Sequence, residues 1–375
     1  MNVAAATRAY EDWLGGQLEL VPKDLDRKHK RMQESPFIFL RASYYRWLQC
    51  IDELAPDLAA PELACVGDLH VENFGTWRDA EGRLVWGIND FDESERLPYT
   101  YDLARLATSA VLATGDGTLR VSPREACEAV LVGYRESLAA GGRPFVLAGE
   151  HEELAGLVAG VLAPGPRSWW KDLSEDELLA PSPEHDHVPD GASGALTAVL
   201  PDPDWEYEVR RRVAGVGSLG RRRIVLVGDH DGAPVARELK QLAPPAGVWL
   251  GRDASQRVPI AAAVRSADPF MHAAGGWVAR RIAPDCVKLD LSAPEGRDVE
   301  RRLLSFMGAE TANIHLASGD AAAPVRDDLD GRRRGWLYET VTRLARATRA
   351  DYSTFKDSGD AASGADEQRL TADGD

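Results

Sequence analysis

Two short polar stretches of the chain collect side chains that could hold a metal ion. The first, CVGDLHVENFG, contains Asp68, His70 and Asn73, and the second, INDFDES, contains Asp90 and Asp92. Carboxylate and amide oxygens suit the hard cation Mg²⁺, and two protein ligands leave room for phosphate oxygens. These stretches therefore predict either polar surface turns or a site that handles a cation together with a charged ligand.

The spacing within these stretches is typical of phosphoryl transfer. Asp68 and Asn73 have the D-x-x-x-x-N spacing of a kinase catalytic loop, in which the Asp accepts the proton of the substrate hydroxyl and the Asn binds magnesium. Asp90 follows at the place of a second metal-binding aspartate. Each residue alone could be a helix cap or a turn residue, but their shared order, with Asp102 in YTYDLARL, favours a site.

A glycine-rich stretch, GVGSLG, lies much later in the chain. Gly215, Gly217 and Gly220, with Ser218 between them, precede the strand-like RRIVLV, a context typical of the loop that covers ATP phosphates in kinases. Glycine lets backbone N–H groups approach phosphate oxygens because it has no Cβ. Lys240, in VARELKQL, stands where a kinase lysine would bind the α- and β-phosphates. The alternatives are a plain hairpin and a solvated lysine at a strand end.

Other polar residues near these motifs have two interpretations. His70 could ligate a metal or could serve its loop structurally. Asp92 supports Asp90, and the two acids could instead hold two ions. The run Arg221–Arg223 is expected to be a solvated face, although it lies close enough to the glycine-rich stretch to meet a substrate anion.

Composition and charge limit the class of protein. The chain has 375 residues, of which 44% are hydrophobic and 28% charged, as is ordinary for a soluble protein of two lobes or two modest domains. The net charge of −16 argues against nucleic acid or an anionic membrane as the main partner. The cysteines form no CxxC pair, so a reducing cytoplasm fits best. We find neither a signal-peptide pattern at the N-terminus nor an apolar run long enough for a membrane span.

Hydrophobic periodicity predicts an α+β fold. Helices are expected up to about Gln49, with Ser35 as an N-cap, in YDLARLATSAVLAT and SPREACEAVLVGYRESLAA, and near 150–163, 296–317 and 332–350. ELACVG and RLVWGIND are predicted strands. Three further strands are predicted in YEVRRRVAGVGSLGRRRIVLVGDHDGAPVARELKQL, and GGWVARRIAPDCVKLDLS is predicted to be another hairpin.

The predicted elements divide the chain into four parts. A part with the catalytic loop covers 1–204, a sheet with the glycine-rich stretch and Lys240 covers 205–293, and further helices cover 294–356. The segment 357–375 is rich in Asp, Ala and Gly without periodicity, and is predicted to be a disordered acidic tail.

Two resemblances follow from these motifs. KRMQESPFIFLRAS, GDLHVENFG, INDFDES, YDLARLATS, GVGSLGRR and DYSTF resemble the bacterial family called domain of unknown function 2252, whose name supplies no reaction. The shorter segment 67–106 resembles the catalytic segment of aminoglycoside phosphotransferases and choline kinases. This second resemblance implies a protein-kinase-like fold in which Asp102 supports the catalytic loop, and in which His70 packs and hydrogen-bonds the loop.

The order of the motifs is inverted relative to kinases, in which the glycine-rich loop and the lysine come first. A circularly permuted protein-kinase-like fold, with a mainly antiparallel small-lobe sheet and a mostly helical large lobe, accounts for this order, because chain termini often lie close together. A kinase lysine is normally held by a glutamate of the following helix, but 241–282 contains no Glu. Either the lysine is poorly positioned, or another acid replaces the glutamate: Asp253, Asp268, Glu238 or Glu208.

These observations predict an ATP- and Mg²⁺-dependent phosphotransferase for an unidentified hydroxyl-bearing acceptor, a small molecule rather than a protein. Asp68 would be the base, Asn73 and Asp90 the metal ligands, and Lys240 the phosphate clamp. Three alternatives stay open: nucleotidyl (AMP) transfer with ATP reversed, a nucleotide-binding pseudokinase, and a metal-dependent phosphoesterase that uses Asp90 with Asp92. The phosphoesterase would need several histidine ligands and explains neither the glycine-rich stretch nor the lysine.

Overall fold

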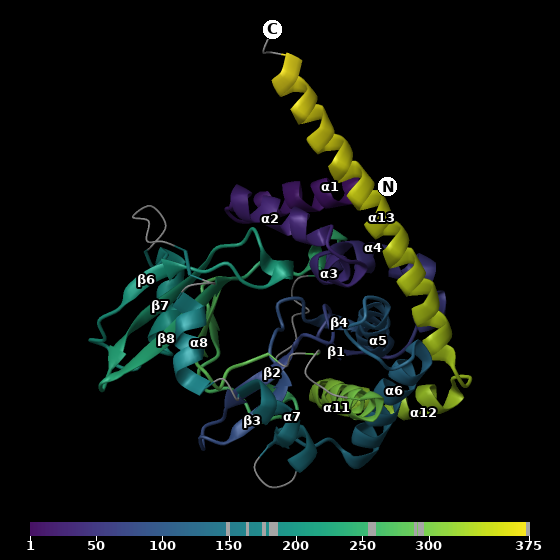
Figure 1. The fold of residues 1–375 in the computed structure, drawn as a ribbon. Coiled ribbons are helices and arrows are strands. Elements are labelled where there is room, and N and C mark those ends of the chain that lie inside the picture. The colour runs from purple at the N-terminus through teal and green to yellow at the C-terminus, as the bar shows by residue number, and fades with distance from the viewer. Residues whose placement is uncertain are drawn as a thin grey trace.

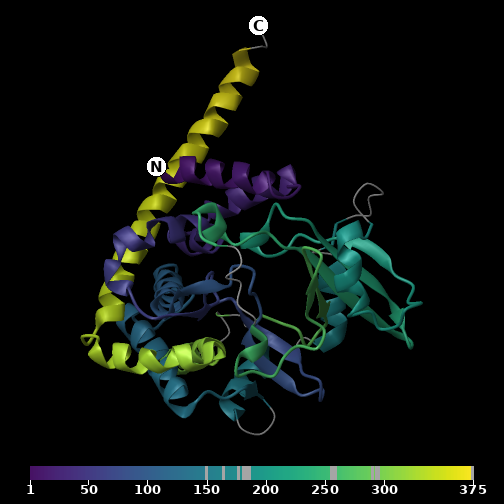
Figure 2. The ribbon, with the colours of Figure 1, turned by 180° about the vertical axis from the view of Figure 1, so that it is seen from behind.

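A computed structural model describes most of the chain, namely residues 1–147, 151–162, 165–174, 178–179, 187–253, 260–288, 291 and 296–372. The protein has an α+β fold, as the sequence predicted, with a five-stranded antiparallel sheet on one side and a mostly helical part on the other (Figure 1). The first and last helices lie side by side, as both ribbon views show (Figures 1 and 2).

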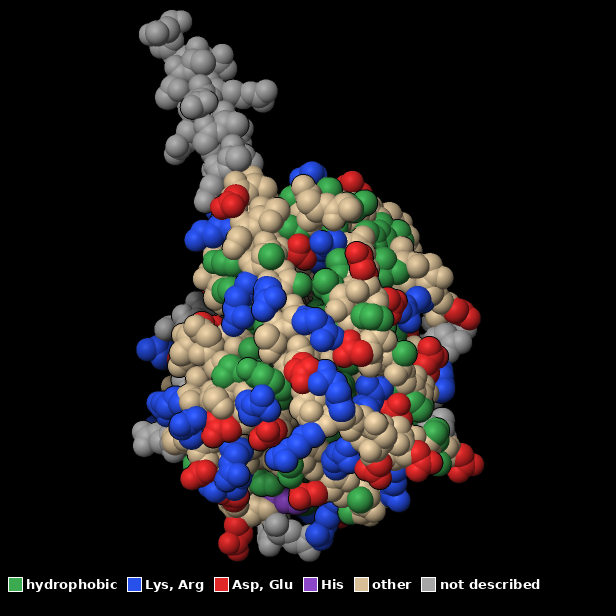
Figure 3. Space-filling model, turned by 90° about the vertical axis from the view of Figure 1, so that its right-hand side faces the viewer, with side chains coloured by type: hydrophobic (Ala, Val, Ile, Leu, Met, Phe, Trp, Pro, Cys, Tyr) green, Lys and Arg blue, Asp and Glu red, His purple; other side chains and the backbone are tan. Residues whose placement is uncertain are grey.

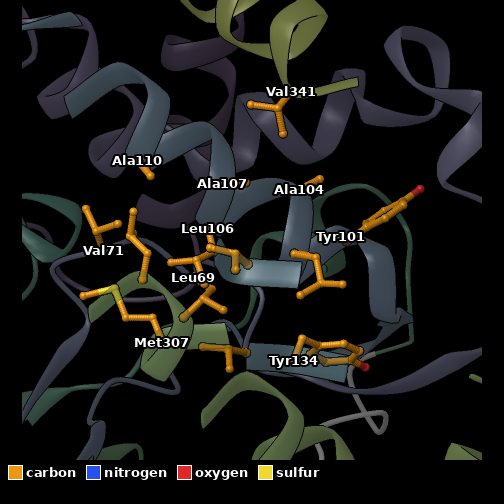
Figure 4. Close-up of a cluster of buried hydrophobic side chains, with 14 of the residues drawn as sticks. Leu69, Val71, Tyr101, Ala104, Leu106, Ala107, Ala110, Tyr134, Met307 and Val341 are labelled. Atoms are coloured by element: carbon orange, nitrogen blue, oxygen red, sulfur yellow. The ribbon is translucent and has the colours of Figure 1, made fainter. Parts of the chain in front are cut away.

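Helices from the two ends of the chain build the helical part. Their bounds are α1 (Val3–Gly15), α2 (Pro22–Met32), α3 (Pro36–Ala42), α4 (Tyr44–Leu54), α5 (Tyr99–Gly115), α6 (Pro123–Ala140), α11 (Arg297–His315), α12 (Ala323–Gly331) and α13 (Trp336–Ala372). α5 is buried over nearly its whole length, and α6, α11 and α13 pack against it. Figure 4 shows Leu69 and Val71 meeting Met307 of α11 and residues of α5 in one apolar cluster. The loop that carries Asp68 is therefore held by the core.

Local sequence signals set where two of these helices begin. Ser35 is the N-cap of α3, as predicted, and its hydroxyl accepts a hydrogen bond from the backbone N–H of Ile38 at 3.2 Å, with Pro36 as the first helical residue. Ser122 and Glu125 form a reciprocal capping box at the start of α6. Such caps satisfy N–H groups that have no acceptor within the helix.

Two small antiparallel sheets carry the first two motifs. β1 (Glu62–Cys65) pairs with β4 (Glu95–Pro98), and β2 (Phe74–Arg78) pairs with β3 (Leu84–Ile88), which also pairs with β5 (Phe145–Val146). The first polar stretch thus joins β1 to β2, and the second joins β3 to β4. The backbone N–H of Asn89 donates to the carbonyl of Asn73 at 3.1 Å, so the two loops lie side by side.

The five-stranded sheet follows in the chain. Its strands, in spatial order, are β6 (Glu208–Arg211), β7 (Arg223–His230), β8 (Ala233–Gln241), β10 (Trp277–Ile282) and β9 (His272–Ala274). The β7–β8 hairpin turns at Asp231 and Gly232, with φ angles of 51° and 79°, which are typical of tight hairpin turns.

The two faces of this sheet differ in polarity, because successive side chains of a strand point to opposite faces. One face carries Ile224, Leu226 and Leu239, which form an apolar cluster with residues of α9 (Ser193–Thr197). The other face carries charged residues, among them Lys240, and faces the polar loops of the helical part.

The remaining elements are short or lie between these parts. They are α7 (Glu152–Leu162), α8 (Gly165–Asp172), α10 (Ala246–Trp249) and the 3-10 helices η1 (Pro56–Leu58), η3 (Asp190–Ala192), η4 (Val216–Ser218), η6 (Ile260–Ala262) and η7 (Leu316–Ala322). Among the residues described, no helix has the length and apolarity needed to cross a membrane. On the face shown in Figure 3, Lys and Arg side chains lie intermixed with Asp and Glu side chains.

Two sequence predictions differ from the structure. The predicted hairpin after Gly275 does not form: β10 pairs with β9, which precedes it, and with β8. Pro284, which has no N–H, lies two residues after the end of β10, and the chain continues as a linker. The segment 357–372, predicted to be a disordered tail, continues α13, and its many alanines have high helix propensity.

Candidate active site

The candidate site lies where the charged face of the sheet meets the two polar loops. A cavity of about 750 Å³ lies there, bordered by Lys240 and Arg280 of the sheet and by Asp90 of the second loop. A smaller cavity of about 60 Å³, which shares Asp90 and Lys288 with the first, reaches Asp68. The larger cavity has the size of a small-molecule site.

Lys240 and Asp90, far apart in the chain, form an ion pair. The lysine Nζ lies 3.1 Å from Oδ2 of Asp90 and 2.7 Å from Oδ2 of Asp92. The lysine side chain is 8% exposed, whereas that of Asp90 is 41% exposed, toward the cavity. Burial acts to raise the pKa of Asp90, but the positive charges of Lys240 and Lys288 outweigh it and lower the pKa below its usual value. Asp90 is therefore ionised at neutral pH.

The lysine is held from across the cavity rather than by an acid that follows it in the chain. Its ion pairs are with Asp90 and Asp92 and not with Asp253, Asp268, Glu238 or Glu208. Lys240 is thus held by two aspartates of the second polar loop, and among the residues that the structure describes no glutamate forms an ion pair with it.

The arginine run Arg221–Arg223 is largely buried, so the prediction of a solvated face is wrong. Arg221 donates to Asp92 at 2.9 Å, and Arg223 donates to Glu238 at 2.9 Å. Their side chains are 10% and 8% exposed. A single sequence did not reveal these carboxylate partners, which let the two cations be buried.

Asp68 lies at the inner end of the smaller cavity. Its Oδ1 accepts hydrogen bonds from the fully buried Arg105, at 2.6 Å from Nη2 and 3.2 Å from Nε. Burial raises the pKa of the Asp68 carboxyl, and the charge of Arg105 opposes that shift. Arg105 therefore fixes the orientation of a carboxylate that borders the cavity.

Asn73 offers the clearest sign of a ligand. The residue is buried, and its side-chain Oδ1 has no hydrogen-bond partner within the described part of the chain. An unsatisfied buried carbonyl costs about 1–3 kcal/mol, so its lone pairs call for a partner. Asn73, Asp68 and Asp90 border the same small cavity. An amide oxygen beside an ionised carboxylate is a donor set that fits Mg²⁺.

Asp102 holds the backbone that leads into the loop carrying Asp68. Its carboxylate accepts the N–H groups of Val66 at 2.7 Å and Gly67 at 2.9 Å, and lies 3.1 Å from Nε2 of His315. Cys65 lies close enough to this pair for the three to ligate a metal. The carboxylate already has these partners, and Nδ1 of His315 is hydrogen-bonded to the hydroxyl of Tyr134. We therefore interpret Cys65, Asp102 and His315 as a structural network.

His70 also makes a contact within its own loop. Its Nδ1 accepts the backbone N–H of Glu72 at 3.2 Å. Burial lowers the pKa of His70 well below its usual value, and the nearby Arg41 adds to this effect. The imidazole is therefore neutral at pH 7, and the contact fits a structural role.

The glycine-rich stretch joins β6 to β7 and covers Asp68. Gly215 and Gly220 have φ angles of 75° and 97°, which favour glycine. A Cβ at Gly217 would lie 2.9 Å from the carbonyl oxygen of Arg41 and 3.7 Å from Oδ2 of Asp68. Only a residue without a side chain fits this approach.

The tip of this stretch is anchored on the helical part. Val216 is 2% exposed and belongs to an apolar cluster with Val3, Met32 and Phe39 of α1, α2 and α3. The hydroxyl of Ser218 donates to the carbonyl of Gly215 at 3.2 Å and accepts from Arg223 at 2.7 Å. The stretch is thus held over the loop that carries Asp68.

Two cations of the site, Arg280 and Lys288, were not predicted from the sequence. Lys288 borders both cavities, and it is placed there by a backbone bridge to Gly75 of β2. A Cβ at Gly75 would lie 2.7 Å from the carbonyl oxygen of Val287, so the final glycine of GDLHVENFG admits the linker. The rarity of lysine in this chain, seven in all, was a signal that could have pointed to Lys288.

The chain belongs to a bacterial protein family of uncharacterized function. The model of domain of unknown function 2252, described as an uncharacterized protein conserved in bacteria, matches residues 20–153 and 207–358. A search of curated proteins and a search of solved structures each gave no significant match. Asp68, Asn73, Asp90, the glycine-rich stretch and Lys240 all lie within the matched segments.

Proposed function

We propose that this protein is an ATP- and Mg²⁺-dependent phosphotransferase. The observation that carries the proposal is the ion pair of Lys240 with Asp90, because Asp90 also borders the smaller cavity together with Asp68 and Asn73. The sequence suggested each of these residues separately for one chemistry. An arrangement of unrelated turn residues would not be expected to bring all of them to one place.

The larger cavity would take the nucleotide, with its phosphates between the glycine-rich stretch and Asp90. Asn73 and Asp90 would hold Mg²⁺, which supplies positive charge to the phosphate oxygens when bound. Because charge in phosphoryl transfer spreads over the oxygens of the transferred group, positioning and cations supply most of the rate.

Asp68 would act as the base. The acceptor hydroxyl oxygen forms a bond to the γ-phosphorus while the bond to the β–γ bridging oxygen breaks, and ADP leaves. The hydroxyl proton passes to Asp68, whose Oδ1 stays bound to Arg105. The raised pKa of Asp68 makes it a stronger base than an exposed aspartate.

A circularly permuted protein-kinase-like fold is part of the proposal. The chain leaves the sheet and enters α11, whose last residue, His315, lies 3.1 Å from Asp102. Just beyond it, Ser318 accepts the N–H of Ala64 at 2.8 Å. In space, therefore, the segment after the sheet leads directly to the strand before the catalytic loop, the order found in kinases. Together with the neighbouring terminal helices (Figure 2), this supports the permutation.

A second candidate is a nucleotide-binding protein that transfers nothing. It is favoured by the Asp68–Arg105 ion pair and by the small volume, about 60 Å³, beside Asp68. A two-metal phosphoesterase is disfavoured, because Asp92 binds two cations, Lys240 and Arg221. Nucleotidyl transfer would use the same residues with ATP reversed.

The proposal includes a small-molecule acceptor and a cytoplasmic location. The four cysteines form no disulfide, as a reducing compartment would require.

The variant Asp68→Asn tests the enzyme against the sensor. Asparagine can still accept a hydrogen bond from Arg105 but is a much weaker base. In the enzyme, ATP affinity by calorimetry stays near wild type, while transfer, or slow ATP hydrolysis measured as ADP release, falls about 10²-fold or more. Equal turnover in both proteins would refute the role of Asp68. Tight binding without turnover in either, across a panel of hydroxyl acceptors, would favour the sensor.

A further inference from the structure

The cavity face of the sheet holds a carboxylate surrounded by arginines. Glu238 of β8 is fully buried, and its carboxylate binds Arg212, Arg223 and Arg280. Burial acts to raise the pKa of Glu238, but the three arginines hold it well below its usual value. A buried anion of this kind fixes the orientation of the cations that surround it.

Arg280 is the member of this group that still has donors to offer. It lies directly opposite Glu238 on β10, and its Nε donates to the carboxylate at 2.6 Å. Neither of its terminal nitrogens has a hydrogen-bond partner among the residues that the structure describes. The side chain is 25% exposed and borders the larger cavity. Two parallel N–H donors are therefore presented to whatever occupies that cavity.

Lys240, by contrast, is already occupied. Its ammonium binds Asp90 and Asp92 and is 8% exposed. Glu238 and Lys240 are two residues apart on β8, so they point to the same face at roughly 7 Å along the strand. That spacing is comparable to the span of a triphosphate chain.

We propose that Arg280, oriented by Glu238, is a phosphate-binding residue for the polyphosphate of the nucleotide. The proposal rests on the proposed function. One end of the polyphosphate lies at Asp90 and Lys240, and the other end accepts hydrogen bonds from Arg280. The segment 241–282, which follows Lys240, has no glutamate that could pair with a phosphate-binding cation. Glu238 and Arg280 supply such a pair instead.

The test compares Arg280→Gln and Arg280→Lys with the control Arg210→Gln. Arg210 lies on β6 of the same sheet, where it donates to the carbonyl of Leu179. Binding of ATP with Mg²⁺ and of inorganic tripolyphosphate is measured by calorimetry, after circular dichroism has shown that each variant folds. Arg280→Gln is expected to weaken both ligands about ten- to a hundred-fold, the usual size for a hydrogen bond to a charged group. Arg280→Lys keeps the ion pair with Glu238, so its affinities should lie between those of Arg280→Gln and wild type. The control Arg210→Gln should bind both ligands as tightly as wild type.

The outcomes separate this inference from the proposed function. If wild type binds ATP and both Arg280 variants bind it equally well, the inference is wrong and the proposed function stands. If tripolyphosphate binds in an Arg280-dependent way but ATP does not bind, the anion site is real and the ATP proposal is wrong. If wild type binds neither ligand, both are wrong.

Discussion

Asp90 and Asp92 should respond differently to the same chemical change, because the structure gives them different surroundings. The carboxylate of Asp90 is 41% exposed toward the cavity, and its ion-pair partner Lys240 keeps a second partner. Asp90→Asn should therefore cost the free energy of unfolding about 1 kcal/mol or less. Asp92 is 11% exposed and binds both Lys240 and Arg221. Asp92→Asn should cost about 3 kcal/mol, as expected when a buried ion pair loses one partner.

The two variants should differ in the opposite order in how much a ligand raises their Tm. At a nucleotide concentration a hundred times the Kd, mass action stabilises the wild type by about 2.7 kcal/mol. That corresponds to a rise in Tm of about 5 °C or more. Asp90→Asn should lose this rise, because an amide replaces the charged metal ligand. Asp92→Asn, although less stable, should keep most of it.

The assay is thermal unfolding of the three proteins with no addition, with Mg²⁺, with ATP and with both. The unliganded curves serve as the control for folding. A full rise of Tm with ATP and Mg²⁺ in Asp90→Asn would mean that this residue is only a turn residue and that the phosphate site lies elsewhere.

Three further changes test the closed arrangement of the site. Gly217→Ala would place a Cβ 2.9 Å from the carbonyl oxygen of Arg41, so it should lower both Tm and nucleotide affinity, whereas Gly156→Ala, with open space around it, should not. Val216→Ala removes two buried methyl groups and should cost about 1.6 kcal/mol, with faster amide hydrogen exchange in the glycine-rich stretch; unchanged exchange would show that the apolar anchor is unimportant. Burial raises the pKa of Glu93 from 4.5 to about 7, so its contribution to stability is present below pH 4.5 and is lost as pH rises through 7. Glu93→Gln should therefore gain Tm relative to wild type at pH 8 but not at pH 4, and a constant difference would contradict the shift.

Local signals in the sequence were sufficient for much of the fold. Ser35 and Pro36 mark the start of α3 because capping depends on neighbouring residues alone. The hairpin between β7 and β8 was predictable for the same reason, since its turn requires the residues found at Asp231 and Gly232. The motif that contains Asp68 gave Asp68, His70 and Asn73, which border the smaller cavity.

Long-range pairing was not predictable in the same way. Arg221 and Arg223 were predicted to lie on a solvated face, because their carboxylate partners lie on other strands or loops of the chain. Lys288 reaches the cavity only because its linker bridges to Gly75, more than two hundred residues earlier. Such contacts depend on how elements pack, and a single sequence carries no record of that packing.

The question of the missing glutamate has a structural answer in the segment that follows Lys240. Instead of a helix lying on the sheet, this segment crosses to the helical part, where the N–H of Ala246 donates to Glu93 at 2.7 Å and Trp249 packs against Tyr10 and Tyr45. The lysine is consequently held by aspartates on the opposite side of the cavity. In the proposed function, a cation that binds Asp90 would compete with Lys240, which keeps its ion pair with Asp92. The proposed metal site would therefore share Asp90 with the ion pairs by which Lys240 and Arg221 join the sheet to the second polar loop.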